Sequence, residues 1–157
     1  MEKQILDIYN SLQEIAWHFG DHGINGKCCE DLSFIEFMAL KRVYENTDIS
    51  IQEIGMNLNI TKSGATKIIN RLERKGYVIR KNSPIDGRVC CVGATEAGVM
   101  VISKIMAKNT NHIKAILEEM EPAVLQDISA ALKILSNSTD KYNEINRSGG
   151  VCLIQDS

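Results

Sequence analysis

The sequence predicts a mainly α protein with a small β-hairpin wing, folded as a winged helix-turn-helix with long helices at both ends. Three observations predict this class. A short helix, a turn and a second helix follow one another over residues 51–74, two β-prone runs joined by turn formers come next, and long amphipathic stretches flank the block. Because 157 residues fit one domain of ordinary size, we expect a single domain in which residues 33–94 form the winged helix-turn-helix part.

Two helices are predicted before this block. Apolar side chains recur at spacings of three and four over residues 5–19, which is typical of a long amphipathic helix. Three glycines in residues 20–27 predict a loop. Ser33 and Glu36 have the spacing of a capping box and predict the start of a second helix, which ends near Asn46. Its inward-facing side chains are predicted to be Phe34, Phe37, Leu40 and Tyr44.

In the helix-turn-helix, the residue spacing separates an apolar face of the second helix from a polar one. After a short helix with Ile54 inside, the chain turns at Asn59, and Thr61 caps the next helix. The side chains of this helix at i, i+3, i+4 and i+7 are apolar and are predicted to be buried: Ala65, Ile68, Ile69 and Leu72. The opposite face is polar and basic and carries no carboxylate: Ser63, Thr66, Lys67, Asn70, Arg71 and Arg74. Gly76 is expected to end the helix in the left-handed conformation.

A wing and two more helices complete the prediction. Residues 77–80 and 89–92 are β-prone, and the turn formers Pro84 and Asp86-Gly87 between them favour a hairpin. On its second strand, Cys90 and Cys91 are expected to point to opposite faces. Thr95 then caps a long helix, Pro122 opens the last helix, and residues 144–157 are predicted to be a flexible tail.

The charge distribution indicates a polyanion site. Residues 59–90 hold eight basic and two acidic side chains, although the whole chain has a net charge of -2. A basic island in an acidic chain is typical of a focused nucleic-acid surface. Charge alone also fits a solvated helix face.

Several classes of protein are excluded or disfavoured. No apolar stretch has the length of a signal peptide or a membrane span, so we expect a cytoplasmic protein with no membrane partner. The five cysteines lack C-x-x-C spacing, which predicts reduced thiols and not a disulfide framework. No phosphate loop, H-E-x-x-H or nucleophile elbow is present, so we expect no enzyme, no cofactor and no metal; a cysteine nucleophile beside His18 or His22 is left open.

The order of elements, with Asp86-Gly87-Arg88 in the wing and Thr95-Glu96-Ala97-Gly98 after it, resembles the MarR family of regulators over about residues 5–143. The family often has a basic residue in place of Gly87 and a leucine in place of Ala94. The resemblance implies a homodimer, held by residues 1–27 and 95–143, that binds a pseudo-palindromic operator in double-stranded DNA with two recognition helices in successive major grooves. Repression is the family's commoner activity.

The predicted DNA contacts fall on the recognition helix and the wing. We expect base contacts from Ser63, Thr66, Lys67 and Asn70, and phosphate contacts from Lys62 and Arg71. Thr61 and Arg74 complete this set. The resemblance implies that Arg88 enters the minor groove and that Asp86 steadies it. Taken singly, each polar residue of the helix also fits a solvated surface, and Asp86-Gly87 also fits plain turn chemistry.

A sensing function is the least specified part. The resemblance implies that a small ligand between the dimer helices and the reading head modulates DNA affinity, with a thiol- or metal-responsive regulator using Cys28 and Cys29 as the alternative. The candidate sensing residues are Trp17, His18, His22, Cys28, Cys29, Tyr44 and His112. Phe37 occupies the place where zinc-responsive members have a histidine, so no metal site is predicted. A winged helix that only binds proteins is the remote alternative.

Overall fold

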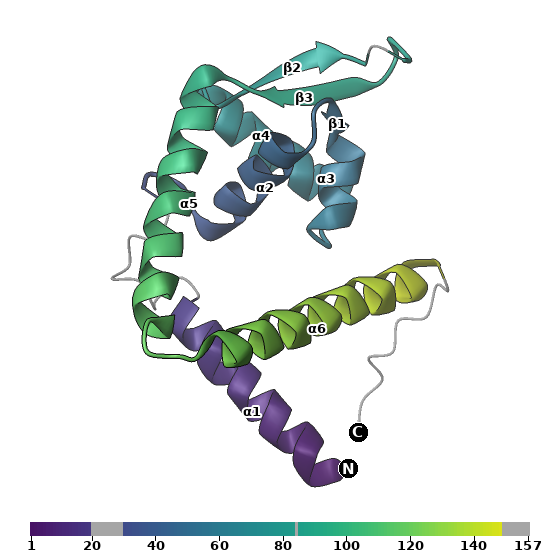
Figure 1. Cartoon of the computed structure of the whole chain (residues 1–157). Helices are drawn as coiled ribbons and strands as arrows, with labels where there is room; N and C mark the ends of the chain where they lie inside the picture. The colour runs from purple at the N-terminus through teal and green to yellow at the C-terminus, as the bar shows by residue number, and fades with distance from the viewer. Residues whose placement is uncertain (20–29, 84, 149–157) are drawn as a thin grey trace. The chain divides into compact units, whose positions relative to one another are not determined.

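The computed structural model describes residues 1–19, 30–83 and 85–148. The chain forms two compact units, Met1–Thr110 and Asn111–Ser157. In chain order the elements are α1 (Glu2–Phe19), α2 (Phe34–Glu45), β1 (Ile49–Ser50), α3 (Ile51–Asn57), α4 (Lys62–Arg74), β2 (Val78–Asn82), β3 (Cys90–Ala94), α5 (Glu96–Leu117) and α6 (Pro122–Ser148) (Figure 1). This mainly helical chain with a small sheet confirms the predicted fold class.

The sheet has three antiparallel strands in the order β1-β3-β2. The predicted hairpin is present, with Arg80 opposite Val92 and Val78 opposite Ala94. The strand β1 was not predicted, because two residues are too few to give a sequence pattern; Ile49 pairs with Val92 on the other edge of β3. In Figure 1 the hairpin extends past α2, α3 and α4, which lie together below it.

The core of the first unit is formed by one face of each of α2, α3, α4 and α5 together with the sheet. The four apolar residues predicted to be buried on α4 are all buried, which fixes the direction of its polar face. Leu40, Ile54 and Ile69 have no exposed surface at all, and each such side chain contributes about 1.5–3 kcal/mol by leaving water. Cys91 is in this core and Cys90 is exposed, as the alternation along a strand predicted.

The predicted helix caps are confirmed. Ser33 and Glu36 form the capping box at the start of α2, and the side chain of Thr61 accepts a hydrogen bond from the Gly64 N–H at 3.0 Å. Gly76 has a φ of 79° after α4, in the left-handed region where it avoids a Cβ clash. A second capping box at Ser50 and Glu53, which starts α3, was not predicted.

Two expectations for α2 and one for the C-terminus are wrong. Phe34 and Tyr44 were expected to face inward, but they are 42% and 43% exposed. Phe34 is in the first turn, at the margin of the core, and Tyr44 follows the buried Val43 by a helical step of about 100°. The last helix also continues to Ser148, because the sequence has no helix breaker before the glycines that follow. Residues 144–148 are therefore helical and do not belong to a tail.

Candidate nucleic-acid interface

The turn between α3 and α4 sets the position of α4. Asn59 adopts a positive φ of 54°, which asparagine tolerates better than most residues. A Cβ atom on Gly55 would lie 3.2 Å from the Ile60 carbonyl oxygen and 3.5 Å from the Ala65 Cβ. The close approach of the two helices therefore favours glycine at position 55, because a Cβ atom there would be in tight contact with the turn.

The polar face of α4 is largely open to solvent. The exposed side chains are those of Thr61, Lys62, Ser63, Lys67, Asn70, Arg71 and Arg74. Thr66 is half-buried, and its hydroxyl donates a 2.8 Å hydrogen bond to the Lys62 carbonyl in its own helix. Thr66 therefore has only its methyl group and its oxygen lone pairs left for a DNA base.

Asn70 is held in one orientation by a residue of the wing. Arg80 on β2 donates from Nη2 to the Asn70 Oδ1 and from Nη1 to the Glu73 Oε2, the latter at 2.5 Å. A guanidinium group has only donors, so the amide atom that faces it must be the oxygen. The Asn70 NH₂ group is consequently the part of the amide that remains for another acceptor, and the charge of Arg80 is compensated by Glu73.

The tip of the wing is closed by hydrogen bonds between side chains and backbone. Asp86 Oδ1 accepts from the Arg88 N–H at 3.0 Å, and the Asp86 carbonyl accepts from the Val89 N–H at 2.9 Å. The Ser83 Oγ accepts from the N–H groups of Ile85 and Asp86 at 3.2 and 3.3 Å. Asp86 thus holds the backbone of Arg88 and leaves the exposed Arg88 side chain to project from the tip.

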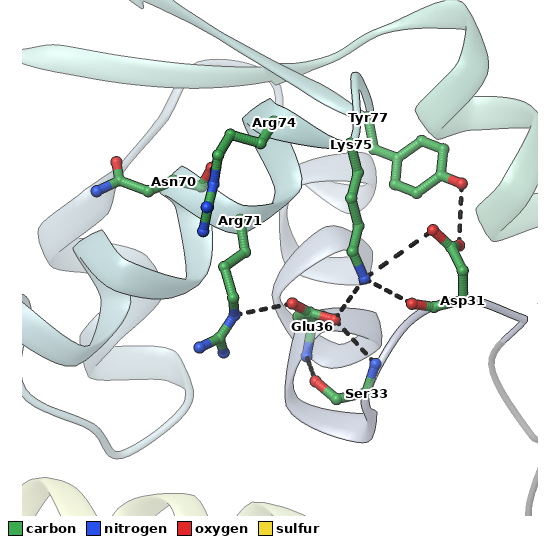
Figure 2. A network of polar contacts seen from close by, with 8 residues as sticks. All are labelled: Asp31, Ser33, Glu36, Asn70, Arg71, Arg74, Lys75 and Tyr77. Carbon is green, nitrogen blue, oxygen red and sulfur yellow. Dashed lines mark hydrogen bonds and ion pairs between the residues drawn. The ribbon is translucent and has the colours of Figure 1, made fainter.

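A buried carboxylate ties α4 to α2 (Figure 2). Glu36 is only 4% exposed. Its Oε2 accepts from the Ser33 N–H at 2.9 Å and from the Lys75 Nζ at 3.0 Å, and its Oε1 accepts from the Arg71 Nε at 2.8 Å. Burial alone would raise the pKa of this carboxyl, but the hydrogen bonds from the Ser33 N–H and from the two cations lower it from 4.5 to about 2. Glu36 is therefore an anion at neutral pH.

The same network continues to the segment before α2. The Lys75 Nζ donates to the Asp31 carbonyl oxygen at 2.5 Å, and the Tyr77 hydroxyl donates to the Asp31 Oδ1 at 2.9 Å. Burial, followed by this hydrogen bond, raises the pKa of the Tyr77 hydroxyl. Sequence reasoning assigned Glu36 only a capping role and Arg71 only a phosphate role. No sequence signal connects two residues that are 35 positions apart.

Four of the candidate sensing residues lie in the part of the chain that the structure describes. Trp17 is 63% exposed on α1, next to the exposed His18, and Tyr44 is exposed on α2. His112 is exposed on the part of α5 that belongs to the second unit. His22, Cys28 and Cys29 lie outside the described residues. Among those described, no group of three His, Cys, Asp or Glu side chains could hold a metal ion.

Known proteins share this arrangement. Residues 32–90 match the model of the MarR family. The HTH-type transcriptional regulator MhqR of Bacillus subtilis (strain 168) is 27% identical over 126 residues, which are 80% of this chain and 81% of that protein. The HTH-type transcriptional regulator PapX of Escherichia coli is 29% identical over 107 residues, 68% of this chain and 60% of that protein. The family model therefore covers the helix-turn-helix and most of the wing of this chain, and the two regulators match it over most of its length.

Solved structures share this fold. A MarR family protein from Bacillus stearothermophilus matches with a TM-score of 0.78 at 20% identity, over 88% of this chain and 97% of that one. The regulator BldR from Sulfolobus solfataricus matches with a TM-score of 0.68 at 25% identity, over 85% and 96%. FabT from Streptococcus pneumoniae, solved in complex with DNA, matches with a TM-score of 0.64 at 19% identity, over 90% and 96%.

The chain has a DNA-binding fold of the winged helix-turn-helix type, and it is similar to proteins named as transcriptional regulators. Its curated relatives are regulators and not enzymes, which agrees with the expectation from the sequence. Among the described helices, none is long and apolar enough to cross a membrane.

Proposed function

We propose that this protein is a cytoplasmic repressor that binds a pseudo-palindromic operator in double-stranded DNA as a homodimer. One observation carries the proposal: α4 and the wing expose positive charge that no nearby acid compensates. Within residues 1–19, 30–83 and 85–148, no carboxylate pairs with any of four exposed basic side chains, which are Lys62, Lys67, Arg74 and Arg88. Cations without a partner on one helix and its wing attract phosphates and release counterions.

The assignment of contacts follows from the directions of the side chains. Ser63, Lys67 and Asn70 are exposed on the face of α4 opposite the core, and a helix of this kind fits the major groove, where they reach base edges. Lys62, in the first turn, contacts a phosphate. Arg88 projects from the wing toward the minor groove. FabT, a protein of the same fold, was solved in complex with DNA, which supports DNA as the partner of this fold.

Exposed apolar surface on the terminal helices supports a homodimer. No residue of α1 is buried within the single chain, although its apolar stripe includes Ile5, Ile8 and Ile15 at 59%, 54% and 46% exposure. In the second unit, an apolar hollow of about 530 Å³ is lined mainly by Leu117 and by the α6 residues Leu125, Ile128 and Leu132. A second copy of the chain that packs on residues 1–27 and 95–143 would remove this surface from water.

Modulation by a small ligand completes the proposal. In the first unit, a hollow of about 610 Å³ has Tyr77, Met100 and Lys104 among its lining residues. This volume fits a small organic molecule. The alternative, a thiol- or metal-responsive regulator, depends on Cys28 and Cys29.

The test is fluorescence anisotropy of the reduced full-length protein with labelled DNA from upstream of its own gene, over a salt series. We expect salt-dependent binding, and about tenfold weaker binding with a shallower salt slope for Arg88→Ala. Lys41→Ala, which removes from α2 a charge that is paired with Glu45 at 3.7 Å, is the control and should bind as the wild type does. Binding that stays at the non-specific level, or an unchanged affinity of Arg88→Ala, would reject the proposal.

A further inference from the structure

We infer that Glu36 is a positioning residue for DNA binding: from the core side, it holds Arg71 and Lys75 so that the outer nitrogens of Arg71 are aimed at a DNA phosphate. The inference rests on the proposed function and deepens it. It assigns to Glu36, which is too buried to touch DNA, a part in DNA affinity, and it makes Arg71 a bridge between the protein core and the DNA backbone.

The first argument is that the Arg71 guanidinium faces the buried Glu36 on one side and solvent on the other. Its Nε donates to the Glu36 Oε1 at 2.8 Å, yet the Arg71 side chain is 44% exposed while that of Glu36 is 5% exposed. In Figure 2 the two terminal nitrogens of Arg71 point away from Glu36. A guanidinium can donate through its Nε to one acceptor and through its terminal nitrogens to another. Arg71 can therefore keep its bond to Glu36 while it binds a phosphate.

The second argument is that Glu36 contacts α4 and the residue after it one turn apart. Lys75 follows Arg71 by four positions, and its Nζ lies 3.0 Å from the Glu36 Oε2. The carboxylate is itself fixed by the Ser33 N–H at 2.9 Å. A rotation of α4 about its axis would break both cation contacts. Glu36 thus resists any rotation that would turn Ser63 and Asn70 away from the groove.

The third argument is the charge balance of the cluster. Glu36 is ionised at neutral pH, because its pKa is lowered to about 2. The Lys75 Nζ also lies 3.9 Å from the Asp31 Oδ2. Two anions therefore balance two cations, and the exposed end of the Arg71 guanidinium is the part of the cluster that offers positive charge to a phosphate. The ion pair also removes much of the freedom of a long side chain before DNA binds, so less conformational entropy is lost on binding. Without Glu36, the Arg71 guanidinium would keep its charge but would no longer be held in one orientation toward a DNA phosphate.

The test compares Glu36→Gln with Glu53→Gln in the full-length protein, by fluorescence anisotropy with DNA from upstream of its own gene. Glutamine keeps the shape and a capping acceptor but loses the charge. Glu53 forms the same kind of capping box on α3 and is exposed, without an ion pair in the described residues, so its variant should bind within about twofold of the wild type. We expect Glu36→Gln to bind about tenfold more weakly.

A double-mutant cycle separates positioning from a purely structural role. Arg71→Gln should itself weaken binding, and Glu36→Gln should add little in the Arg71→Gln background, because Glu36 acts through that arginine. Circular dichroism and urea unfolding identify the folded fraction of each variant. If Glu36→Gln does not fold, Arg71→Lys replaces it: lysine keeps the charge but has one ammonium in place of the separate Nε and terminal nitrogens, so the forked geometry is lost and about tenfold weaker binding is expected.

The outcomes are distinct. Wild-type affinity for folded Glu36→Gln, or for Arg71→Lys, overturns the inference and leaves the proposed function intact. Fully additive effects in the cycle also overturn it. If the wild type does not bind DNA above non-specific affinity, the proposed function fails first and the inference falls with it.

Discussion

The backbone of Gly98, in the first turn of α5, packs directly against the carbonyl group of Tyr77 at the start of the wing. A Cβ atom at position 98 would overlap the Tyr77 carbonyl oxygen and would lie 3.0 Å from its carbonyl carbon. Thr95 reinforces the junction, because its Oγ1 donates to the Gly76 carbonyl at 2.6 Å and accepts from the Gly98 N–H at 3.0 Å. The wing and α5 are therefore fixed to each other where α5 begins.

Gly98→Ala should destabilise the protein, although alanine is the better helix former in isolation. The added methyl group would push the first turn of α5 away from the Tyr77 carbonyl, and no side-chain rotation can relieve this overlap. We therefore expect a loss of at least about 2 kcal/mol in the free energy of unfolding. Urea denaturation measures it. Gly87→Ala is the matched control, since nothing lies within 4 Å of a Cβ there. Equal stability of the two variants would show that the junction is not tightly packed.

Protonation of Glu36 should lower the free energy of unfolding of the protein at acid pH. Its pKa is about 2 in the folded chain against 4.5 as the ordinary value. A lowered folded-state pKa gives stability that is present above pH 4.5 and is lost as the pH falls toward 2; the full difference corresponds to about 3 kcal/mol. The groups that face the carboxylate are the Arg71 Nε, the Lys75 Nζ and the Ser33 N–H.

Urea unfolding of the wild type and of Glu36→Gln at about pH 6 and about pH 3 measures this dependence. We expect the wild type to be the more stable of the two at the higher pH and the difference to shrink at the lower pH. Glu53, whose pKa is also lowered by its hydrogen bonds with Ser50, remains in both proteins and leaves a common background. An identical loss of stability in the two proteins would mean that another carboxyl causes the acid sensitivity.

Local spacing predicted the features that depend on near neighbours in sequence. The caps at Ser33 and Thr61, the buried face of α4 and the opposite burial of Cys90 and Cys91 all follow from periods of two or 3.6 residues. The same logic failed for Tyr44, because a period gives the width of an apolar face only roughly.

The contacts that organise the interface were beyond this reasoning. The bond between Glu36 and Arg71 joins residues 35 positions apart, and Arg80 reaches Asn70 from another element. Both are charged or polar residues that local rules place on the surface. Only the packing of α2 and the wing against α4 decides which of them meet, and a single sequence carries no record of that packing.

Arg80 should influence which base Asn70 prefers. Because Arg80 occupies the Asn70 Oδ1, the amide offers its NH₂ group, which favours a base edge with acceptors, such as guanine O6 and N7. Adenine, which also needs an acceptor for its N6 amino group, is matched less well. Arg80→Gln releases the amide, so we expect the preference at that position to broaden toward adenine by about fivefold, or about 1 kcal/mol.

Selection of bound duplexes from a randomised library, followed by sequencing, measures this preference for the wild type and for Arg80→Gln. Arg42→Gln is a suitable control, since Arg42 is likewise paired with a glutamate, Glu45 at 3.1 Å, but on α2. The salt slope should change less for Arg80→Gln than for Arg88→Ala, because Arg80 is already compensated by Glu73. An unchanged base preference at every position would show that Arg80 does not orient Asn70 in the complex.

Ile8 should mark the dimer contact on α1. Its side chain is 54% exposed in the single chain, within the apolar stripe of a helix that has no buried residue. If a second copy covers this stripe, Ile8→Asp places an unpaired charge in the interface, at a cost of several kcal/mol. Sedimentation measures the mass in solution. We expect the wild type to sediment at about twice the chain mass of 17.5 kDa, and Ile8→Asp to sediment as a monomer at micromolar concentration.

Ile85→Asp is the control. This wing position is 97% exposed, so the variant adds the same charge away from α1 and should remain dimeric. Because operator binding through two half-sites needs both recognition helices, Ile8→Asp should also lose most of its DNA affinity. A monomeric wild type, or a dimeric Ile8→Asp, would exclude α1 as the dimer contact.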